Sequence, residues 1–227
     1  MSNYKAILWD NDGVLVDTER FYFEANRQKL KELGVELTLE MYQQFFLLDS
    51  RGAWHLLDGR GYSEEEIEQF KVERNSIYSE LIDSEEVVVE GAAETLEKLS
   101  KHYFMAVVTS AYREHFERIH NRSGFHKYFQ FALVNGEYGK TKPAPDPYLA
   151  GLERSGFKRD ECIVVEDSQR GLRSAVAAGI DCWVIKTEMT AGSDFSLAKR
   201  QFENLIQVRE ALLELSLIHI SEPTRPY

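Results

Sequence analysis

The chain has 227 residues, a formal net charge of −11 and a hydrophobic fraction of 43%, which is typical of a globular protein with one large or two small domains. The negative charge and the lack of clustered Lys and Arg argue against a nucleic-acid partner, because phosphate backbones are bound by basic residues. Neither a run of about 18 apolar residues nor a signal-peptide pattern is present, so we expect no membrane association and a cytoplasmic location.

The first predicted element is a buried strand that ends in acidic residues. The apolar run 7–9 leads directly into Asp10, Asn11, Asp12 and Gly13, and the glycine allows a sharp turn. Two carboxylates this close repel by about 4 kcal/mol in a partly dry site, so we expect a metal ion or a chemical role to offset the repulsion. A calcium-binding loop is one alternative, although its first ligand position would be Leu8 and a strand stands where a helix is needed. A solvated acidic turn is the other.

An all-helical region is predicted from about residue 19 to residue 84. Thr18 is placed to cap a helix that ends at Gly34, and shorter helices are expected at 39–47 and 53–57. A long helix begins at Ser63, where Ser63 and Glu66 form a capping box. The residues expected on the apolar sides of the first and the long helix are Phe21, Ala25, Leu30, Ile67, Phe70, Ile77 and Leu81.

From residue 87 onward, predicted helices and strands alternate. The helices are 92–101, 114–121, 147–155 and 169–178, and the strands are 104–109, 131–134, 162–165 and 182–185. Such alternation indicates a parallel sheet that is covered on both faces. The last helix is expected to bury Leu172, Ala175 and Val176, and the two cysteines, Cys162 and Cys182, are expected to serve as small apolar residues.

The predicted fold is therefore α/β, with a Rossmann-like parallel sheet core and an inserted all-helical cap domain. We expect the core to comprise residues 1–17 and 87–214 and the cap to comprise residues 18–86. In such sheets ligands bind at the carboxyl ends of the strands. The residues that follow each strand are therefore the candidates for function.

Polar residues follow three further strands. Thr109 and Ser110 carry hydroxyls that can hold a phosphate oxygen together with N–H groups of the next helix. Lys142 lies before a proline in a stiff loop, where Asp146 is placed to cap a helix. The fourth strand ends in a pair of acids, Glu166 and Asp167.

Each of these residues by itself has a structural explanation, as a helix cap or as a solvated loop residue. Their recurrence at successive strand ends favours a common site. The segment 136–141 is similar to a phosphate-binding P-loop, but its first glycine stands two residues too close to the second. No G-x-G-x-x-G pattern is present, so we expect no dinucleotide cofactor.

These motifs resemble those of the haloacid dehalogenase superfamily, in particular the members with a helical cap that are similar to β-phosphoglucomutase and phosphoglycolate phosphatase. The resemblance extends from residue 4 to about residue 213. The motifs that carry it are Asp10–Glu19, Val107–Ser110, Lys142–Leu149 and Val165–Gly171.

The resemblance implies that Asp10 is a nucleophile that forms an aspartyl-phosphate, and that Asp12 protonates the leaving alcohol and later accepts a proton from water. It also implies a Mg²⁺ ion that is bound by the Asp10 carboxylate, the backbone carbonyl of Asp12 and Asp167. Glu166 would ligate through water or orient the other ligands. The residues expected to bind the phosphate are Thr109, Ser110 and Lys142.

The presence of Asp12 and Asp167 argues against dehalogenation, which needs no metal and no second acid. Where β-phosphoglucomutases have a cap histidine this chain has Tyr22, and Arg51 is the only cation in the loop 47–52. A mutase must exclude water by tight cap closure, so these differences favour hydrolysis. We expect a Mg²⁺-dependent phosphatase, a monomer or weak dimer, that acts on a small phosphorylated metabolite such as a sugar phosphate, with Tyr22, Arg51 and Trp54 selecting the substrate.

Two alternatives remain open. One is a phosphomutase similar to β-phosphoglucomutase, and the other is a non-catalytic protein that binds a phosphometabolite. The segment from Leu215 resembles a translated sequencing adaptor, with a natural extension as the alternative, so we assign no function to residues 215–227.

Overall fold

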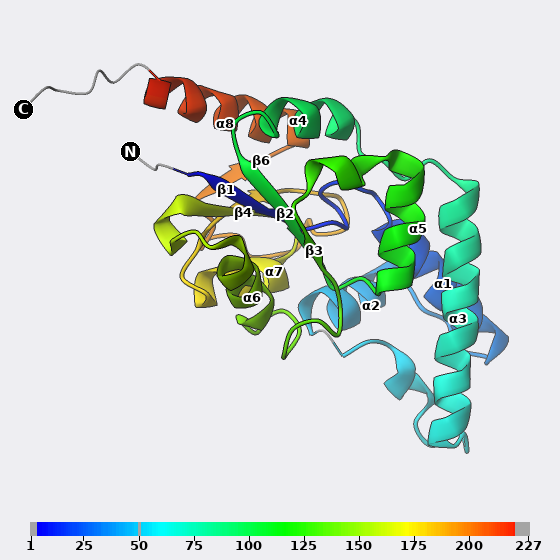
Figure 1. Ribbon diagram of the computed structural model, residues 1–227. Coiled ribbons are helices and arrows are strands. Elements are labelled where there is room, and N and C mark those ends of the chain that lie inside the picture. Colours follow the sequence, from blue (N-terminus) through cyan, green and yellow to red (C-terminus); the bar gives the residue numbers. More distant parts are fainter. Residues whose placement is uncertain (1–3, 50, 221–227) are drawn as a thin grey trace, which may run out of the picture.

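The computed structural model describes residues 4–49 and 51–220, with side chains described up to residue 216. Six parallel strands form one sheet in the order β3-β2-β1-β4-β5-β6 (Figure 1). The strands are β1 (Ala6–Trp9), β2 (Phe104–Val108), β3 (Ala132–Leu133), β4 (Cys162–Glu166), β5 (Asp181–Ile185) and β6 (Arg200–Phe202). The predicted α/β fold class is confirmed, although β6 was not predicted.

Helices cover both faces of the sheet. They are α4 (Ala92–Leu99), α5 (Arg113–Ser123), α6 (Asp146–Ser155), α7 (Gln169–Ala177) and α8 (Leu205–Ile220). Side chains of a strand alternate between the two faces. Trp9 therefore belongs to the apolar cluster under α4, α5 and α8, whereas Leu8 packs with α6 and α7 on the other face. Figure 1 shows these two layers above and below the sheet.

The register of the central strands brings three strand ends together. Trp9, the last residue of β1, is aligned with Val107 in β2 and with Val165 in β4. The residues that follow β1, β2 and β4 therefore emerge side by side at one edge of the sheet. This edge is where the sequence predicted the site.

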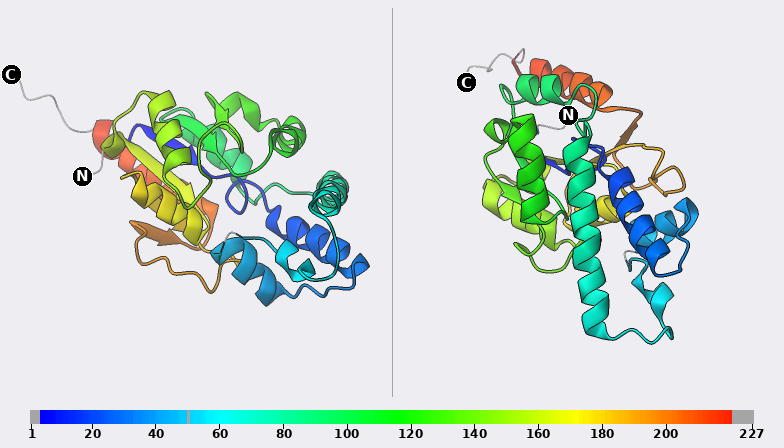
Figure 2. Two further views of the ribbon diagram at one scale, coloured as in Figure 1. Left: turned by 90° about the horizontal axis from the view of Figure 1, so that it is seen from below. Right: turned by 90° about the vertical axis from the view of Figure 1, so that its right-hand side faces the viewer.

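A helical segment lies beside the sheet, beyond the carboxyl ends of its strands (Figures 1 and 2). Its elements are α1 (Glu19–Glu32), α2 (Leu39–Tyr42), a π-helical turn (Gln43–Leu48), a 3₁₀ turn (Trp54–Leu57) and α3 (Glu64–Ser84). The segment has an apolar cluster of its own, which includes Leu30, Leu37 and Tyr42. Phe21 of α1 and Ile82 of α3 instead pack into the core of the sheet. The division of the chain at residues 17 and 87 stays a prediction.

The helix caps differ in part from those predicted. The capping box at α3 is present, since the Glu66 N–H donates to Ser63 Oγ (3.2 Å) and the Ser63 N–H donates to Glu66 Oε2 (2.8 Å). Thr18 precedes α1, but its hydroxyl makes no cap. Asp146 is the first residue of α6, and its carboxylate accepts from the Lys140 N–H (2.9 Å) instead of capping the helix.

Two predicted apolar stripes were partly wrong. Within α7, Val176 is 40% exposed and Ser174 is buried in its place, because its hydroxyl donates to the carbonyl of Ala144 (2.6 Å). Within α3, the buried side chains are Arg74, Tyr78 and Ile82. The predicted stripe of α3 is only partly buried, because this helix packs between α1 and α5 and so turns a different face inward.

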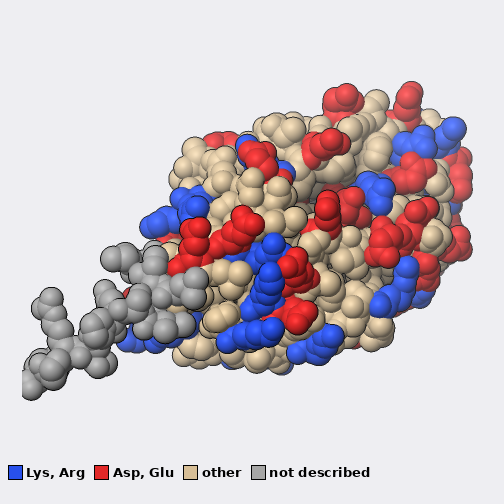
Figure 3. All heavy atoms as spheres, turned by 90° about the horizontal axis from the view of Figure 1, so that it is seen from above, with Lys and Arg blue, Asp and Glu red and all other residues tan. Residues whose placement is uncertain are grey.

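Among residues 4–49 and 51–220, no helix is long and apolar enough to cross a membrane. On the face shown in Figure 3, basic and acidic side chains are interspersed. Of the tail 215–227, residues 221–227 lie outside the described residues, so the adaptor interpretation stays a prediction.

Candidate active site

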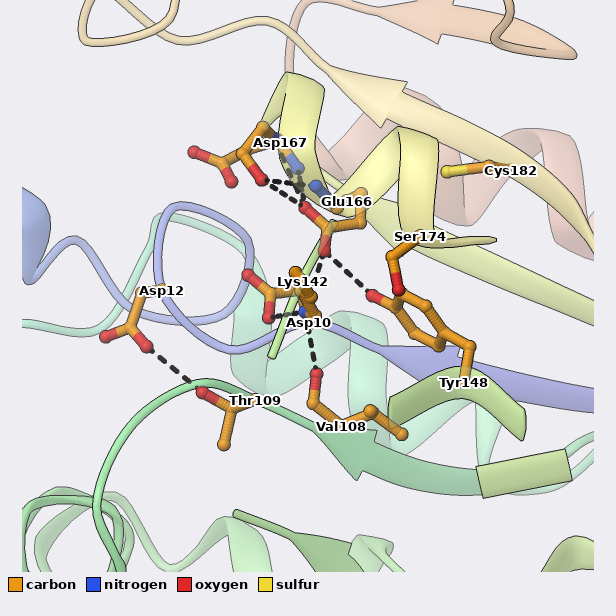
Figure 4. A network of polar contacts seen from close by, with 12 residues as sticks. Asp10, Asp12, Val108, Thr109, Lys142, Tyr148, Glu166, Asp167, Ser174 and Cys182 are labelled. Atoms are coloured by element: carbon orange, nitrogen blue, oxygen red, sulfur yellow. Dashed lines mark hydrogen bonds and ion pairs between the residues drawn. The ribbon is translucent and has the colours of Figure 1, made fainter. Parts of the chain in front are cut away.

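A buried lysine joins three strand ends. Lys142 is 3% exposed, and its ammonium group donates to Asp10 Oδ1 (2.7 Å), Glu166 Oε1 (2.7 Å) and the carbonyl of Val108 (3.0 Å) (Figure 4). All three of its N–H donors are therefore used. The peptide bond between Lys142 and Pro143 is cis. One cation thus connects residues at the ends of β1, β2 and β4, as the predicted common site requires.

Glu166 is fully buried and all its oxygen atoms are in use. Oε1 accepts from Lys142 and from the Tyr148 hydroxyl (2.8 Å), while Oε2 accepts from the N–H groups of Asp167 and Ser168 and from the Ser168 hydroxyl (2.9 Å). These bonds and the Lys142 charge hold the pKa of Glu166 below its ordinary value, although burial opposes this. Because a carboxylate has about four acceptor positions, Glu166 has no free position for a further ligand. It is placed to orient Lys142.

Asp10 and Asp167 form the part of the acidic cluster that is open to a cation. One oxygen atom each of Asp10, Glu166 and Asp167 lies within 4.8 Å of the others. Burial, together with the charge of Glu166, raises the pKa of Asp10 to about 7 and raises the pKa of Asp167 well above its ordinary value. These shifts indicate that the cluster holds more negative charge than Lys142 offsets.

Asp167 is the residue that needs a further positive partner. Its side chain is 6% exposed, and its carboxylate accepts no hydrogen bond from any residue that the structure describes. The turn after β1 comes so close that a Cβ atom at Gly13, whose φ is +79°, would overlap this carboxylate. A buried, unpaired carboxylate is costly. Together with Asp10 it fits a hard divalent cation such as Mg²⁺, which prefers carboxylate oxygen ligands.

Asp12 faces the cavity from the turn after β1. Its carboxylate accepts from the Thr18 hydroxyl at the start of the helical segment and from the Thr109 hydroxyl after β2 (3.3 Å) (Figure 4). Thr109 is fully buried and also accepts from the Ala111 N–H (3.0 Å). The role of Thr109 in binding the phosphate stays a prediction. The two hydroxyls fix the orientation of Asp12.

Ser110 is placed differently from its neighbour Thr109. It lines the cavity, and its buried hydroxyl oxygen has no hydrogen-bond partner within the described part of the chain. It is therefore free to bind a group that enters the cavity.

The cavity has a volume of about 400 Å³ and lies between the strand ends and the helical segment. The predicted site residues that line it are Asp10, Asp12, Tyr22, Arg51, Trp54, Ser110, Lys142 and Asp167. Thr109 and Glu166, also predicted, lie behind this wall and contact Asp12 and Lys142. The structure thus brings the predicted residues together from six segments of the chain.

Several lining residues were missed by the sequence analysis, and Arg74 of α3 is one of them. It is 5% exposed, its guanidinium donates to Asn26 Oδ1 (2.7 Å), and it lies over the ring of Tyr22 at 4.4 Å. A signal was available, because Arg74 interrupts the apolar positions of α3 at a helical spacing from Phe70 and Tyr78. A charged residue at a core position is a candidate for function.

Arg170 is a second missed cation, in the first turn of α7. Burial acts to lower the pKa of its guanidinium, but nearby carboxylates, chiefly Glu19 of α1, raise this pKa above its ordinary value. Glu19 in turn accepts a hydrogen bond from the Tyr42 hydroxyl. Arg170 thus places a positive charge from the sheet core beside an acid from the helical segment. Its position in the motif after Asp167 was the available signal.

Asn11 lies between the two aspartates and is held from behind by His120 of α5. The Nε2–H of His120 donates to Asn11 Oδ1 (2.7 Å), its Nδ1 accepts from the Ser123 hydroxyl (3.2 Å), and both partners of the first bond are fully buried. Burial lowers the pKa of His120 to about 3, so the imidazole is neutral. The backbone carbonyl of Asn11 also accepts the N–H groups of residues 14–16. The turn that carries the aspartates is therefore rigidly supported.

Comparison with known proteins places the chain in a family. The sequence model of the family described as haloacid dehalogenase-like hydrolase matches residues 7–185. A phosphorylated carbohydrates phosphatase of Thermotoga maritima is 32% identical over 183 residues, which are 78% of this chain and 82% of the relative. Protein CbbY of Rhodobacter capsulatus is 28% identical over 213 residues, 88% of this chain and 93% of the relative.

The fold is also that of solved structures. The crystal structure of CbbY from Rhodobacter sphaeroides in complex with phosphate has a TM-score of 0.79 and 23% sequence identity, covering 90% of this chain and 96% of that one. The family resemblance inferred from the motifs is thereby confirmed. This chain belongs to the haloacid dehalogenase-like hydrolases.

Proposed function

We propose that this protein is a Mg²⁺-dependent phosphatase that hydrolyses a small phosphorylated sugar or similar metabolite through an aspartyl-phosphate on Asp10. The observation that carries the proposal is the pairing of Asp10 with Lys142 beside an unpaired, buried Asp167 at the floor of the cavity. A phosphatase of phosphorylated carbohydrates among the relatives supports the same reaction class. The predicted alternatives, a mutase and a non-catalytic binding protein, are tested below.

Asp10 is the nucleophile in this proposal. Its Oδ1 is held by Lys142, which leaves Oδ2 to attack the phosphorus atom. The bond from phosphorus to the leaving oxygen breaks as Asp12 donates its proton to that oxygen. Asp12 then accepts a proton from the water molecule that attacks the aspartyl-phosphate, which releases phosphate and restores Asp10. The hydroxyls of Thr18 and Thr109 keep Asp12 facing the cavity during both steps.

The carboxylates of Asp10 and Asp167 and the backbone carbonyl of Asp12 would hold Mg²⁺, with Glu166 orienting Lys142 behind them. When bound, the ion supplies positive charge that offsets the charge of the phosphoryl group and of the acids. The Ser110 hydroxyl and the charge of Lys142 stabilise the phosphoryl oxygens, and Thr109 acts with them. Such positioned charges are the main source of catalysis in phosphoryl transfer.

The helical segment selects the substrate in this proposal. Tyr22, Trp54, Arg51 and Arg74 line the cavity opposite the acids. Aromatic rings pack against the apolar faces of sugars, and the guanidinium groups bind hydroxyls or a second anionic group. Burial raises the pKa of Tyr22, so its phenol stays protonated and does not replace a proton-accepting histidine. This feature supports hydrolysis over the phosphomutase alternative.

The first test is the variant Asp10→Asn with an aryl phosphate as substrate. Loss of the nucleophilic carboxylate should abolish release of inorganic phosphate, whereas Asp17→Asn should not, because Asp17 is an exposed acid in the same motif. Retained turnover in Asp10→Asn would overturn the role of Asp10. Ligand-induced stabilisation without any turnover of the wild type would favour the non-catalytic alternative.

The second test is Mg²⁺ binding, measured by thermal unfolding. An ion that binds only the folded state at a hundredfold excess over its Kd stabilises by about 2.7 kcal/mol. Asp167→Asn should lose most of this stabilisation. A panel of sugar phosphates, assayed for both phosphate release and isomer formation, separates a phosphatase from a mutase.

A further inference from the structure

One residue of the cavity wall has no role in the mechanism above. His115 lies in the first half of α5, is 6% exposed and lines the cavity. Neither of its ring nitrogens has a hydrogen-bond partner among the residues that the structure describes. Neither nitrogen is among the enclosed polar atoms that lack a partner in the described part of the chain, so both are accessible to solvent and free to bind a group that enters the cavity.

Packing fixes the orientation of this imidazole. Its ring lies edge-on to Tyr78 of α3, with centroids 4.8 Å apart and an interplanar angle of 82°, and it also packs against Tyr112 at 6.4 Å. Tyr78 is itself buried and lines the same cavity. The ring is therefore held between the sheet core and the helical segment. A binding group that is fixed in this way contributes to specificity because little conformational freedom is lost when it binds.

The charge around His115 favours a neutral ligand group. Burial lowers the pKa of His115, and although Glu114 and Asp12 act to raise it, the result stays below the ordinary value. A neutral imidazole has one donor and one acceptor, which matches a hydroxyl group, also both donor and acceptor. Anionic groups have better partners elsewhere in the cavity, namely Arg51, Lys71 and Arg74.

The position of His115 along α5 indicates which hydroxyl it meets. Ser110, Ala111 and Tyr112 line the cavity at the start of α5, next to the proposed phosphate site. The charge of Asp12, which would protonate the ester oxygen, acts on the His115 imidazole, and both side chains line the same cavity. A hydroxyl close to the ester oxygen is therefore the substrate group that we expect His115 to meet.

We propose that His115 is a specificity-determining residue that hydrogen-bonds a substrate hydroxyl close to the phosphate ester, so that the substrates are phosphates of polyols or sugars rather than of simple alcohols. This inference rests on the proposed phosphatase function. It adds a residue of the sheet core to the substrate contacts that the helical segment makes.

The test compares two substrates that differ in a single hydroxyl group, glycerol 1-phosphate and 1,3-propanediol monophosphate. We expect the wild type to hydrolyse the glycerol ester with a kcat/KM higher by on the order of tenfold, the size expected for one hydrogen bond in a buried site. His115→Phe keeps a ring against Tyr78 but removes both nitrogens. Its ratio of the two kcat/KM values should fall to near one.

Two further variants keep the test independent of any folding defect in His115→Phe. The amide groups of His115→Asn and His115→Gln are near the positions of Nδ1 and Nε2, so at least one variant should restore part of the preference. The control is His126→Phe, because His126 is 40% exposed and does not line the cavity. Its ratio should equal that of the wild type.

The inference is overturned if the wild type does not distinguish the two esters, or if His115→Phe lowers both rates and leaves their ratio unchanged. It is also overturned if neither amide variant exceeds His115→Phe in preference. These results differ from a failure of the proposed function. If the wild type hydrolyses neither the two esters nor an aryl phosphate, the phosphatase proposal is wrong, and the substrate inference fails with it.

Discussion

Replacing Lys142 by Met is the most informative perturbation of the site. Lys142 neutralises Asp10 and Glu166 at 2.7 Å each. Methionine keeps much of the side-chain volume but has no charge and no donor. The substitution therefore leaves two buried carboxylates, together with Asp167, without the lysine that offsets their charge.

The magnitude follows from the geometry. Oxygen atoms of Asp10, Glu166 and Asp167 lie within 4.8 Å of one another, and two unit charges at that distance repel by about 3.5 kcal/mol at an effective dielectric constant of 20. Removing one partner of a buried ion pair costs about 3–5 kcal/mol. We therefore expect Lys142→Met to lower the free energy of unfolding by about 3–5 kcal/mol. We also expect kcat to fall by about 10²- to 10³-fold, because a positioned charge beside Asp10, the proposed nucleophile, is lost.

Urea unfolding with and without Mg²⁺ measures the first effect. Part of the lost stability should return at saturating Mg²⁺, because the ion supplies positive charge to the same acids. The matched control is Lys140→Met in the same loop, where the lysine is exposed and the change should be below about 0.5 kcal/mol. A Lys142→Met protein as stable and as active as the control would refute the inference that this lysine holds the acidic cluster together.

Two further predictions concern the support of the site. Burial lowers the pKa of His120 from 6.5 to about 3, so below pH 6.5 the unfolded chain binds a proton that the folded protein does not. Stability should therefore fall as the pH decreases, with a slope that approaches about 1.4 kcal/mol per pH unit and a total loss of about 1.7 kcal/mol from pH 6.5 to pH 5. In His120→Phe this contribution should be missing from the pH dependence of the urea midpoint, and equal slopes in both proteins would contradict the assignment. Gly171→Ala should displace Glu166 and lower both the melting temperature and the activity, because the added Cβ would overlap the Glu166 carboxylate. Gly192→Ala is the control, because a Cβ there meets open space and the change should be neutral. A Gly171→Ala protein with unchanged stability and activity would show that Glu166 can move freely.

Sequence pattern alone was enough to identify the fold class, and most of its candidate site residues line the cavity. Helices alternating with apolar strands permit only a parallel sheet with both faces covered. Because the strand ends of such a sheet share one edge, acids after the first and fourth strands were expected at a common site. The tertiary structure places Asp10 and Asp167 close together because β1 pairs directly with β4. Lys142 was identified by the motif and by its place in a loop after a strand.

Other features depended on tertiary contacts that leave no local pattern. Strand β6 is short and two of its three residues are exposed, so its alternation was too weak to recognise. Ser174 is buried in place of Val176 because a carbonyl of another segment accepts its hydroxyl proton. The carboxylate of Asp146, expected to cap a helix, instead binds the Lys140 N–H. In the last two cases a partner outside the helix determined the position of the side chain.

The same reason explains which site residues were missed. Arg74, His115 and Arg170 reach the cavity because α3 packs between α1 and α5 and because α7 begins at the edge of the sheet. Hydrophobic periodicity indicates that a residue faces inward, but it does not indicate whether the residue faces the apolar core or a cavity. Hydrophobic periodicity and the residues that follow each strand therefore indicated the edge of the sheet where the candidate site lies. The packing of helices from distant parts of the chain decided which polar side chains complete it, because burial of a polar group depends on partners that only the folded chain brings near.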